Sequence, residues 1–443
     1  MKYFGTDGFR GRVNEVLCLK HAIKIGEYLG HYYKGVNPDA KIVIGKDTRK
    51  SSYMFEYALS AGIVSMGADV YLMHVTTTPC VSYITKKNGF DCGIMITASH
   101  NPYHDNGIKI IDSNGDKMKD DFLQEIEDYI DDKITIECGS DTGKCNDYLF
   151  GRNEYVKHLI DIPTESFKGY KIGLDCANGA SFSVASNIFN LLGADVFVIN
   201  NQPDGENINV KCGSTCPEIL QEYVVKNGLD VGFAFDGDAD RCMMVDEQGK
   251  LVDGDGIIYI ISKYLKLHSK LNKDTVVATV MSNIGLTKSL KIQGINIVHT
   301  DVGDKYVAQE MFENGYVVGG EQSGHIILGD YATTGDGILT ALLLTNILVS
   351  SKAVASSLTA GLEIFPQQLV NVSVPDKDLV MKDEELLKSL DECNKELDGS
   401  GRVLLRKSGT EPLIRIMVEA ETEDKCAEII NRYKKYVEEK FVG

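Results

Sequence analysis

Short apolar runs alternate with amphipathic stretches along most of the chain. The stretches 54–65 and 219–227, which lie between such runs, have the spacing of helices with one buried face. Short strands that alternate with helices predict parallel-type α/β units with helices on both faces of a sheet. The apolar runs fall into three successive sets of similar layout, at 41–47, 67–75 and 90–100, at 171–179, 193–201 and 229–241, and at 276–285, 295–303 and 316–325.

The end of the chain follows a different pattern. Residues 369–378 predict a strand, and a charged helix follows near Asp383–Glu396. Residues 401–422 predict two strands that flank a turn, and Lys425–Lys440 predicts a last amphipathic helix. We therefore expect three similar mixed α/β domains and a smaller C-terminal α+β domain. The predicted domains are 1–150, 151–253, 254–366 and 367–443.

Composition excludes several classes of protein. The formal net charge of −18 argues against nucleic-acid binding, which needs a basic surface. The longest apolar runs, such as Ile338–Val349, are too short to span a bilayer, and the N-terminus lacks the apolar core of a signal peptide. The 11 cysteines follow no disulfide framework. These features predict a cytoplasmic protein with reduced thiols and no membrane partner.

The third strand of each unit runs directly into an unusual polar loop. The loops read ASHNP at 98–102, DGDADR at 236–241 and GEQSGH at 320–325. Ligands of open α/β sheets bind beyond the carboxyl ends of the strands. Three equivalent loops could converge on one cleft, or each unit could bind a ligand separately, and the repetition alone does not decide between these arrangements.

The DGDADR loop predicts a metal site. Asp236, Asp238 and Asp240 are two residues apart, and alternate side chains of an extended backbone share a face. Three crowded carboxylates repel one another unless a cation neutralises them, and oxygen ligands suit Mg²⁺ or Ca²⁺. A calcium EF-hand is disfavoured: Glu247 stands at its twelfth position, but Arg241 replaces the required glycine. The remaining alternative is a solvated acidic turn.

Two further loops carry groups that suit a phosphorylated ligand. In RKSGTEP, hydroxyl and backbone N–H groups around a glycine could cradle an anion beside two arginines, although the same residues also suit a plain turn. The residues concerned are Arg406, Ser408, Gly409, Thr410 and Arg415.

Polar groups alternate in GEQSGH, and glycines surround an arginine near the N-terminus. Glu321 and Ser323 suit a hydroxyl-rich ligand such as a sugar, whereas His325 is either structural or a proton-transfer group. In GTDGFRG, Arg10 belongs to an ordinary turn or reaches a phosphate.

Three interpretations of Ser99 compete. It is a turn serine before Asn-Pro, or a hydrolase nucleophile with His100 as base, or a carrier of a phosphoryl group. Adjacent side chains rarely face each other, and the G-x-S-x-G elbow is absent, which disfavours the hydrolase. A phosphoserine needs cations nearby, and a metal on the aspartate loop, Arg10 and Lys109 could supply them. Lys109 could alternatively act as a base.

The four loop motifs together resemble one family. TASHNP, DGDADR, GEQSGH and RKSGTEP, in this order and spacing, are similar to the motifs of the α-D-phosphohexomutase superfamily over the whole chain. Within it the chain most resembles the bacterial phosphoglucosamine mutases. That finer resemblance rests on GTDGFRG, PDGENINVKCGST, VMSNIG, DVGDKYV and the glutamine of GEQSGH.

The resemblance implies a fold and a reaction. The fold is heart-shaped, with three mixed α/β domains and a fourth TATA-box-binding-protein-like domain around a central cleft. The reaction is an intramolecular phosphotransfer, in the isomerase class, that interconverts glucosamine 6-phosphate and glucosamine 1-phosphate for UDP-N-acetylglucosamine synthesis. A hexosamine 1,6-bisphosphate is the bound intermediate or primer. A phosphomannomutase or phosphoglucomutase is the nearest alternative, and a serine hydrolase or a non-catalytic phosphosugar-binding protein are alternatives from other classes.

The resemblance also implies roles for the candidate residues. Ser99 carries the phosphoryl group, and one Mg²⁺ is held by a phosphoserine oxygen with the three aspartates. The catalytic set is Ser99, Lys109, Arg10, His100 and His325, the metal set is Ser99, Asp236, Asp238 and Asp240, and the substrate-binding set is Glu321, Ser323, Arg406, Ser408, Gly409, Thr410 and Arg415. A homodimer is also expected from the resemblance.

Overall fold

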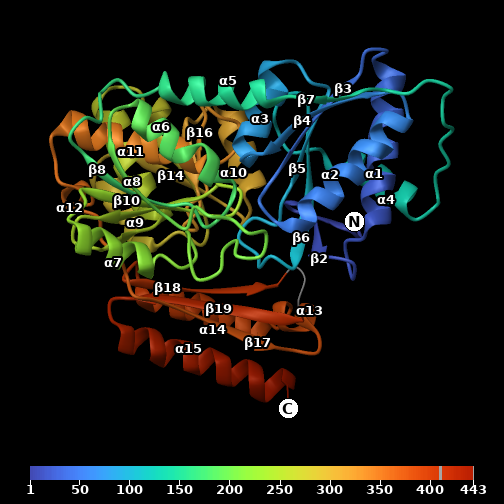
Figure 1. Ribbon diagram of the computed structural model, residues 1–443. Coiled ribbons are helices and arrows are strands. Elements are labelled where there is room, and N and C mark those ends of the chain that lie inside the picture. Colours follow the sequence, from blue (N-terminus) through green and yellow to red (C-terminus); the bar gives the residue numbers. More distant parts are fainter. Residues whose placement is uncertain (409–411, 443) are drawn as a thin grey trace. The chain divides into compact units, whose positions relative to one another are not determined.

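The computed structural model describes residues 1–408 and 412–442. The chain forms two compact units, Met1–Met281 with Ile297–Ala360, and Ser282–Asn296 with Gly361–Gly443. Each unit is described by itself. The first unit contains three sheets and the second contains one, and the ribbon of Figure 1 follows the chain through all four in order of sequence.

The first sheet is mixed, with strand order β1-β2-β6-β5-β3-β4-β7. β5, β3, β4 and β7 run parallel to one another, β6 runs antiparallel to β5, and β2 runs antiparallel to β6. Its strands are β1 (Phe4–Gly5), β2 (Gly8–Arg12), β3 (Lys41–Lys46), β4 (Asp69–Val75), β5 (Cys92–Ile96), β6 (Asp105–Ile111) and β7 (Cys145–Asp147), and its helices are α1 (Leu19–Val36), α2 (Lys50–Ser65), α3 (Thr78–Lys87), α4 (Asp120–Ile130) and α5 (Leu149–Ile160).

Alternation along the strands explains why helices cover both faces of this sheet. Ile42 and Ile44 of β3 belong to one buried cluster with residues of α1, α2 and α4. A Cβ on Gly45 would come within 2.5 Å of the Val81 side chain, so the opposite face of β3 lies against α3. α1 and α2 approach closely because Gly26 of α1 and Gly62 of α2 present bare backbone: a Cβ on Gly26 would meet the Leu59 carbonyl oxygen at 2.5 Å.

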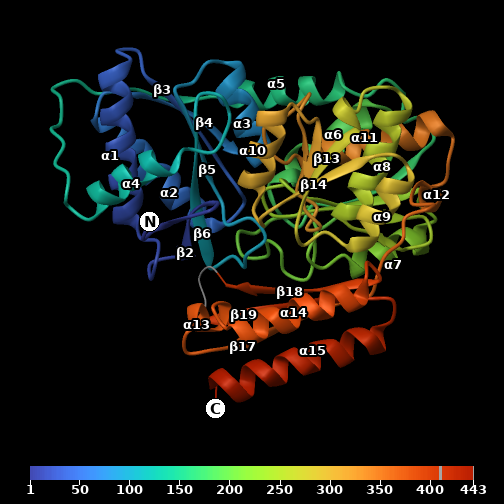
Figure 2. The same ribbon diagram turned by 180° about the vertical axis from the view of Figure 1, so that it is seen from behind.

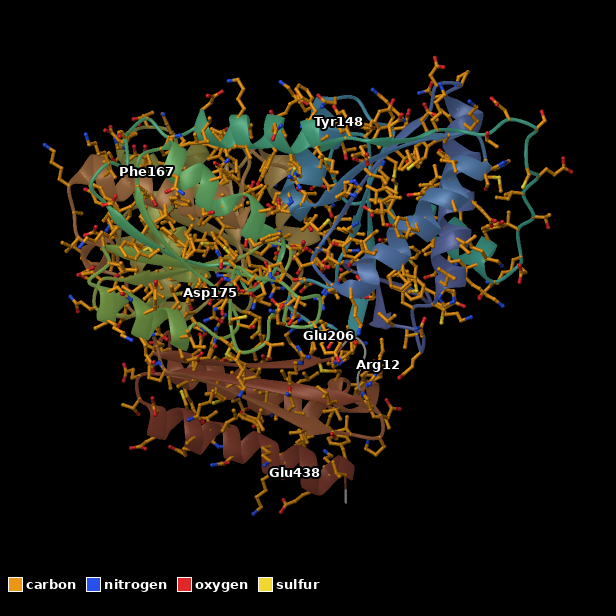
Figure 3. All side chains as sticks on the ribbon, viewed as in Figure 1. Arg12, Tyr148, Phe167, Asp175, Glu206 and Glu438 are labelled. Atoms are coloured by element: carbon orange, nitrogen blue, oxygen red, sulfur yellow. The ribbon has the colours of Figure 1, made fainter. Side chains whose placement is uncertain are left out.

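The second sheet has the order β12-β11-β10-β8-β9, in which β9, β8 and β10 are parallel. Leu220 and Val224 of α7 pack on Ala234 and Val245 of this sheet. The elements are β8 (Lys171–Asp175), η1 (Ala180–Ser183), α6 (Ala185–Leu191), β9 (Asp195–Ile199), α7 (Glu218–Asn227), β10 (Val231–Phe235), β11 (Cys242–Asp246) and β12 (Leu251–Val252). Figure 3 labels Asp175 at the end of β8, where its carboxylate accepts hydrogen bonds from the Ala177 and Gly213 N–H groups.

The third sheet has the order β14-β13-β15-β16. Its elements are α8 (Gly254–Leu267), η2 (Asn272–Asp274), β13 (Thr275–Thr279), β14 (Asn296–Thr300), α10 (Asp304–Asn314), β15 (Val318–Gly320), β16 (Ile326–Leu328), α11 (Gly337–Ser351) and α12 (Ala355–Leu358). Figure 2 gives the clearest view of β13, β14 and α10. α11 is apolar on every side, and all its residues up to Leu348 are buried, as expected of a helix enclosed by protein.

In all three sheets the strand before the polar loop is followed by an antiparallel strand. β5 pairs with β6, β10 with β11, and β15 with β16. Each polar loop therefore connects two antiparallel neighbours, and the otherwise parallel sheets are mixed, as the expected mixed α/β domains require. A short connection cannot return the chain to a parallel partner, which needs a crossover of a dozen or more residues.

The second unit is an antiparallel sheet covered by helices. The order is β17-β19-β18, and α14 and α15 lie on one face of the sheet (Figure 1). The elements are α9 (Ile284–Ile292), β17 (Gln367–Ser373), α13 (Lys377–Met381), α14 (Glu384–Leu397), β18 (Gly401–Lys407), β19 (Leu413–Ala420), α15 (Glu423–Val437) and the π-helical η3 (Glu438–Val442). The expected strands and helices of the tail are confirmed. Among the described residues, no helix combines the length and apolar character needed to cross a bilayer.

Candidate active site

Ser99 lies in the turn that follows β5, and it is buried. Its backbone is left-handed, with φ 50°, and its Oγ donates a hydrogen bond of 2.6 Å to Asp236 Oδ2 at the end of β10. The loops of the first and second sheets therefore converge within the first unit. A serine hydroxyl held against a buried carboxylate is a specific arrangement rather than an ordinary surface turn.

A buried arginine holds the serine loop in this position. Arg49 Nη2 donates to the carbonyl oxygens of Ser99 at 2.8 Å and Asn101 at 2.9 Å. Arg49 Nε in turn donates to Asp47 Oδ2 at 2.8 Å, and both residues are fully buried. The Asn209 side-chain amide also donates to the Ser99 carbonyl at 2.8 Å. The backbone of the loop is thus fixed from two sheets.

The expectation that Ser99 and His100 face apart is wrong. Ser99 Oγ and His100 Nδ1 lie 3.3 Å apart, because the left-handed φ of Ser99 turns the two adjacent side chains toward each other. Burial, together with the positive charges of Arg241 and Arg10, lowers the pKa of His100 to about 4. His100 is therefore neutral near pH 7, and because the Ser99 hydroxyl hydrogen is donated to Asp236, His100 Nδ1 acts as the donor when it bonds to Ser99 Oγ.

The three aspartates gather in a turn, not on an extended strand. Residues 236–241 connect β10 to β11, and Ala239 has a left-handed φ of 57°. The expectation that an extended strand places the three side chains on one face is therefore wrong. The expected cluster is nevertheless present, because one carboxylate oxygen from each of Asp236, Asp238 and Asp240 lies within 4.8 Å of the others. A Cβ on Gly237 would meet the Ser99 carbonyl oxygen at 2.5 Å, so this turn needs glycine to approach the serine loop.

The carboxylates suit a divalent cation. Burial and the negative charges of Asp240 and Asp238 raise the pKa of Asp236 well above its ordinary value. Asp238 Oδ1 is buried without a hydrogen-bond donor, whereas Asp240 Oδ1 has only the more distant His325 Nδ1 at 3.7 Å and Arg241 Nε at 4.0 Å. Buried carboxylate oxygens without donors are costly, and a bound cation removes that cost. The oxygen-only donor set fits Mg²⁺. Glu247 bonds instead to the Ser356 N–H and hydroxyl groups, which agrees with the rejection of an EF-hand.

Lys109 projects from β6 into the same cluster. Its Nζ lies 2.8 Å from Asp238 Oδ2, 3.1 Å from Asp240 Oδ2 and 3.1 Å from Asp7 Oδ2. Burial alone lowers the pKa of Lys109, but the surrounding carboxylates outweigh it and raise the pKa well above its ordinary value. Lys109 therefore carries its proton, which makes it a cation and a proton donor in this arrangement.

Arg10 of β2 stands beside Lys109. Its Nη2 forms an ion pair with Asp7, while its Nε is buried without an acceptor. An unpartnered guanidinium donor beside the serine and aspartate loops is a ready contact for an anionic ligand.

His325 joins the third sheet to the cluster. Its Nδ1 lies 3.7 Å from Asp240 Oδ1, and its Nε2 lies 3.5 Å from Asp304 Oδ2 and accepts from the Gly335 N–H at 3.0 Å. Burial lowers the pKa of His325, but the hydrogen bond and charge of Asp240 and the charge of Asp304 raise it to about 9. The Gly335 bond needs a lone pair on Nε2, so protonation of that nitrogen exchanges the Gly335 contact for the Asp304 ion pair.

Glu321 and Ser323 lie in the same loop as His325. Glu321 Oε1 accepts from the Gly303 N–H at 3.2 Å, and Ser323 Oγ donates to Glu321 Oε2 at 3.4 Å. The ASHNP, DGDADR and GEQSGH loops are therefore joined through direct contacts within the first unit.

The predicted anion cradle belongs to the second unit. Arg406 of β18 and Arg415 of β19 are directly opposite in the antiparallel ladder, and the Ser408 carbonyl accepts from Lys377 Nζ at 2.7 Å. Residues directly opposite on neighbouring strands project from the same face of the sheet, so both arginines could contact one anion. Gly409 and Thr410 lie outside the described residues.

Sequence reasoning missed several residues that complete the cluster. Asp7, Lys117 and Asp304 join it through ion pairs, Arg49 holds the serine loop, and Thr78 Oγ1 donates to Asp238 Oδ2 at 2.6 Å. The only available signals were GTDGFRG for Asp7, DVGDKYV for Asp304, and the polar GKDTRKS segment at the end of β3 for Arg49. Lys117 and Thr78 had no signal in their local sequence.

Family comparisons match the chain in four segments. The matching models are phosphoglucomutase/phosphomannomutase, alpha/beta/alpha domains I, II and III and C-terminal domain, at residues 1–136, 153–249, 253–365 and 369–435 respectively.

Relatives and solved structures agree with these matches. The phosphoglucosamine mutase of Lachnoclostridium phytofermentans is 52% identical over 96% of this chain and 95% of its own, and that of Bacillus subtilis is 48% identical over 97% of each. A phosphoglucomutase/phosphomannomutase family protein from Burkholderia thailandensis has a TM-score of 0.83 at 24% identity, covering 98% of this chain and 97% of that one.

A more distant structure shares the fold. The Aspergillus fumigatus N-acetylphosphoglucosamine mutase, in complex with GlcNAc-6P and magnesium, has a TM-score of 0.70 at 17% identity over 98% of this chain and 95% of that one. With a four-domain match, and relatives about half identical over nearly the whole length, the chain belongs to the phosphoglucomutase/phosphomannomutase family of phosphohexomutases.

Proposed function

We propose that this protein is a phosphoglucosamine mutase that interconverts glucosamine 6-phosphate and glucosamine 1-phosphate. Phosphorylated Ser99 gives its phosphoryl group to the free 1-hydroxyl of glucosamine 6-phosphate, so that one P–O bond breaks at Oγ and another forms at the sugar. The resulting 1,6-bisphosphate turns over and returns its 6-phosphoryl group to Ser99 Oγ. In the first half-reaction the sugar 1-hydroxyl gives up its proton and Ser99 Oγ takes one up, and in the second Ser99 Oγ gives up its proton and the sugar 6-oxygen takes one up, so atoms and charge balance.

The contact between Ser99 Oγ and Asp236 carries this proposal. The 2.6 Å hydrogen bond joins the only serine of the TASHNP loop to the carboxylate cluster. A turn serine needs no such partner, and a hydrolase triad needs a carboxylate behind its histidine rather than behind its serine. The curated relatives at 48% and 52% identity, which are phosphoglucosamine mutases, support the choice of sugar.

Asp236, Asp238 and Asp240 would hold one Mg²⁺ together with an oxygen of phosphorylated Ser99. The metal, when bound, supplies positive charge that stabilises the transferring phosphoryl group. The buried Asp238 Oδ1, which has no hydrogen-bond donor, supports this site. Magnesium in the Aspergillus fumigatus relative agrees with the choice of metal.

Cationic and titratable side chains around Ser99 take the other roles. Arg10, with its buried unpartnered Nε, and the protonated Lys109 provide fixed positive charge for the phosphoryl group. Lys109 and His325 are the proton-transfer candidates. His100, neutral and 3.3 Å from Ser99 Oγ, orients the hydroxyl when the serine is free.

Two further sets of residues would hold the sugar and the distal phosphate. Glu321 and Ser323 would bind sugar hydroxyls, and Arg406, Ser408, Gly409, Thr410 and Arg415 would bind the phosphate that is not being transferred. The directly opposed Arg406 and Arg415 support an anion site on β18 and β19. A phosphate cradle that accepts either end of the sugar suits a reaction in which the two phosphates exchange places.

The decisive test is turnover by the phosphorylated, Mg²⁺-loaded protein. Glucosamine 6-phosphate should be converted to glucosamine 1-phosphate, observed by phosphorus NMR, and Ser99→Ala should abolish the conversion and the serine phosphorylation detected by intact mass. Absence of glucosamine 1-phosphate with protein shown to be phosphorylated would refute the proposal.

The alternatives differ in measurable ways. A phosphomannomutase or phosphoglucomutase would have a higher kcat/KM on mannose or glucose phosphates than on glucosamine 6-phosphate. A serine hydrolase would be labelled at Ser99 by a fluorophosphonate and would not need Mg²⁺. A non-catalytic phosphosugar-binding protein would be stabilised by the sugar phosphate without turnover.

We propose that the protein is cytoplasmic and that it forms a homodimer. All 11 cysteines are free thiols, as expected in a reducing environment. Light scattering on the purified protein tests the homodimer.

A further inference from the structure

Lys117 joins two carboxylates that come from different parts of the first unit. Its Nζ lies 2.6 Å from Asp7 Oδ1, in the turn between β1 and β2, and 2.6 Å from Asp304 Oδ2, the first residue of α10. Lys117 itself lies in the loop between β6 and α4. One ammonium group therefore connects the first sheet with the helix that follows β14.

Each of these carboxylates also contacts one proton-transfer candidate. Asp7 Oδ2 lies 3.1 Å from Lys109 Nζ, and Asp304 Oδ2 lies 3.5 Å from His325 Nε2. Asp240 closes the path, 3.1 Å from Lys109 Nζ and 3.7 Å from His325 Nδ1. The side chains form a ring in the order Lys109, Asp7, Lys117, Asp304, His325, Asp240, in which basic and acidic groups alternate.

We propose that Lys117 is a positioning residue that fixes Lys109 and His325 in their places through Asp7 and Asp304. The inference rests on the proposed mutase function and extends it, because it assigns a role to a residue that does not contact the serine. Without the Lys117 ammonium, Asp7 and Asp304 lose their shared cation. Asp7 then attracts Lys109 more strongly and Asp304 attracts His325 more strongly, so both basic groups move relative to Ser99.

A second lysine between the same two regions offers a matched control. Lys305, next to Asp304, lies 3.1 Å from Asp120 at the start of α4. Lys117 and Lys305 are each 30% exposed, and each joins the α4 region to α10. Of these two lysines, only Lys117 contacts Asp7. Lys117→Met and Lys305→Met therefore each remove a lysine bridge, but only Lys117→Met removes a member of the ring.

The first measurement is steady-state turnover of glucosamine 6-phosphate by the full-length, phosphorylated protein. Lys117→Met should lower kcat about 100-fold with KM changed less than about threefold, because small misplacements of reacting groups cost about this much. Lys117→Arg should recover most of the loss, Asp304→Asn should reproduce it, and Lys305→Met should stay within about twofold of wild type. A rise in KM with kcat retained, or equal losses in both lysine variants, would overturn the proposal.

The second measurement does not depend on activity. In protein labelled with nitrogen-15 histidine, the His325 ring signals, assigned with His325→Gln, should shift in Lys117→Met and not in Lys305→Met. Unchanged His325 signals in a folded Lys117→Met protein would overturn the proposal even if kcat falls. If the wild-type protein shows no mutase turnover, the proposed function fails. The nitrogen-15 shift of His325 would still test whether Lys117 positions His325. Should Lys117→Met fail to fold, Asp304→Asn should show the same fall in kcat, and its effect can be compared with that of Lys305→Met.

Discussion

Asp47 and Asp238 are both fully buried, and both lie just beyond the end of a central strand, yet their surroundings differ. Asp47 accepts four hydrogen bonds over both oxygens, from Arg49 N and Nε, Ser52 Oγ and Thr97 Oγ1. Asp238 Oδ2 accepts from Thr78 and Lys109, while its Oδ1 has no donor.

The difference separates a carboxylate whose two oxygens are bonded to protein donors from one that could still bind the proposed Mg²⁺. Each carboxylate oxygen of Asp47 accepts two hydrogen bonds from protein donors, which leaves no oxygen for a further ligand. Asp47 instead holds Arg49, which fixes the serine loop. Asp238 keeps an oxygen free at the cost of burying it without a partner. Burial alone therefore does not distinguish these two carboxylates, whereas the number of their oxygens that accept a hydrogen bond does.

The largest expected effect is on the aspartate that keeps a free oxygen. Asp238→Asn should lower kcat about 10³-fold, because metal charge stabilisation is worth several kcal/mol. Mg²⁺ should no longer raise the Tm of the variant, although the metal-free protein should melt no lower than wild type, since one of three repelling charges is gone. Calorimetry with and without Mg²⁺ checks both points, and a retained Mg²⁺-dependent rise in Tm would contradict the assignment.

Asp47→Ala should lower the stability of the protein but leave its stabilisation by Mg²⁺ intact. It leaves Arg49 charged, buried and unpaired, which should reduce the free energy of unfolding by about 3–5 kcal/mol. The protein that remains folded should still be stabilised by Mg²⁺. Urea denaturation with and without Mg²⁺ measures this, and Asp47→Asn serves as the milder variant. A stability loss confined to the Mg²⁺-loaded protein would show that Asp47 belongs to the metal site.

Asp336 extends the comparison to a third buried carboxylate. Burial raises its pKa to about 6, although hydrogen bonds from the Leu339 N–H and from Tyr155 oppose this shift. A carboxyl whose pKa is raised by folding favours the folded state at low pH, below about pH 4, and loses that contribution as the pH rises through 6.

The neutral variant Asp336→Asn should therefore match wild type near pH 4 and be more stable near pH 8 by about 3 kcal/mol, because Asn also caps helices. Denaturation across this pH range gives the comparison. A stability difference that does not change with pH would show that the ionised carboxylate is not the cause.

The smallest effect is expected for Thr78, which supports Asp238 through a hydrogen bond and is not one of the proposed metal ligands. Thr78→Val removes one donor to Asp238 Oδ2. Such supporting contacts are worth about 10–100-fold in metal affinity, so the Mg²⁺ concentration needed for half-maximal turnover should rise by that factor. kcat at saturating Mg²⁺ should stay near the wild-type value, and a fall in kcat that excess Mg²⁺ does not restore would place Thr78 in the chemistry itself.

Local pattern predicted the elements well and their geometry less well. The apolar runs of β3, β4 and β5 and the helix α7 are found where periodicity indicates them. The same pattern led to an extended DGDADR segment, which is a turn, because a left-handed residue such as Ala239 leaves no trace in the order of polar and apolar side chains. The contact of Ser99 with His100 was missed for the same reason.

The sequence by itself determined the three repeated units, the polar loop at the end of each, and the groups that those loops offer. These features are local, since side-chain period and loop composition follow from neighbouring residues. Only the tertiary structure decided that the three loops of the first unit meet, and that Lys117, Asp7 and Asp304 complete the cluster. Ion pairs between residues more than 100 positions apart depend on how the sheets pack, and no spacing along the chain encodes them.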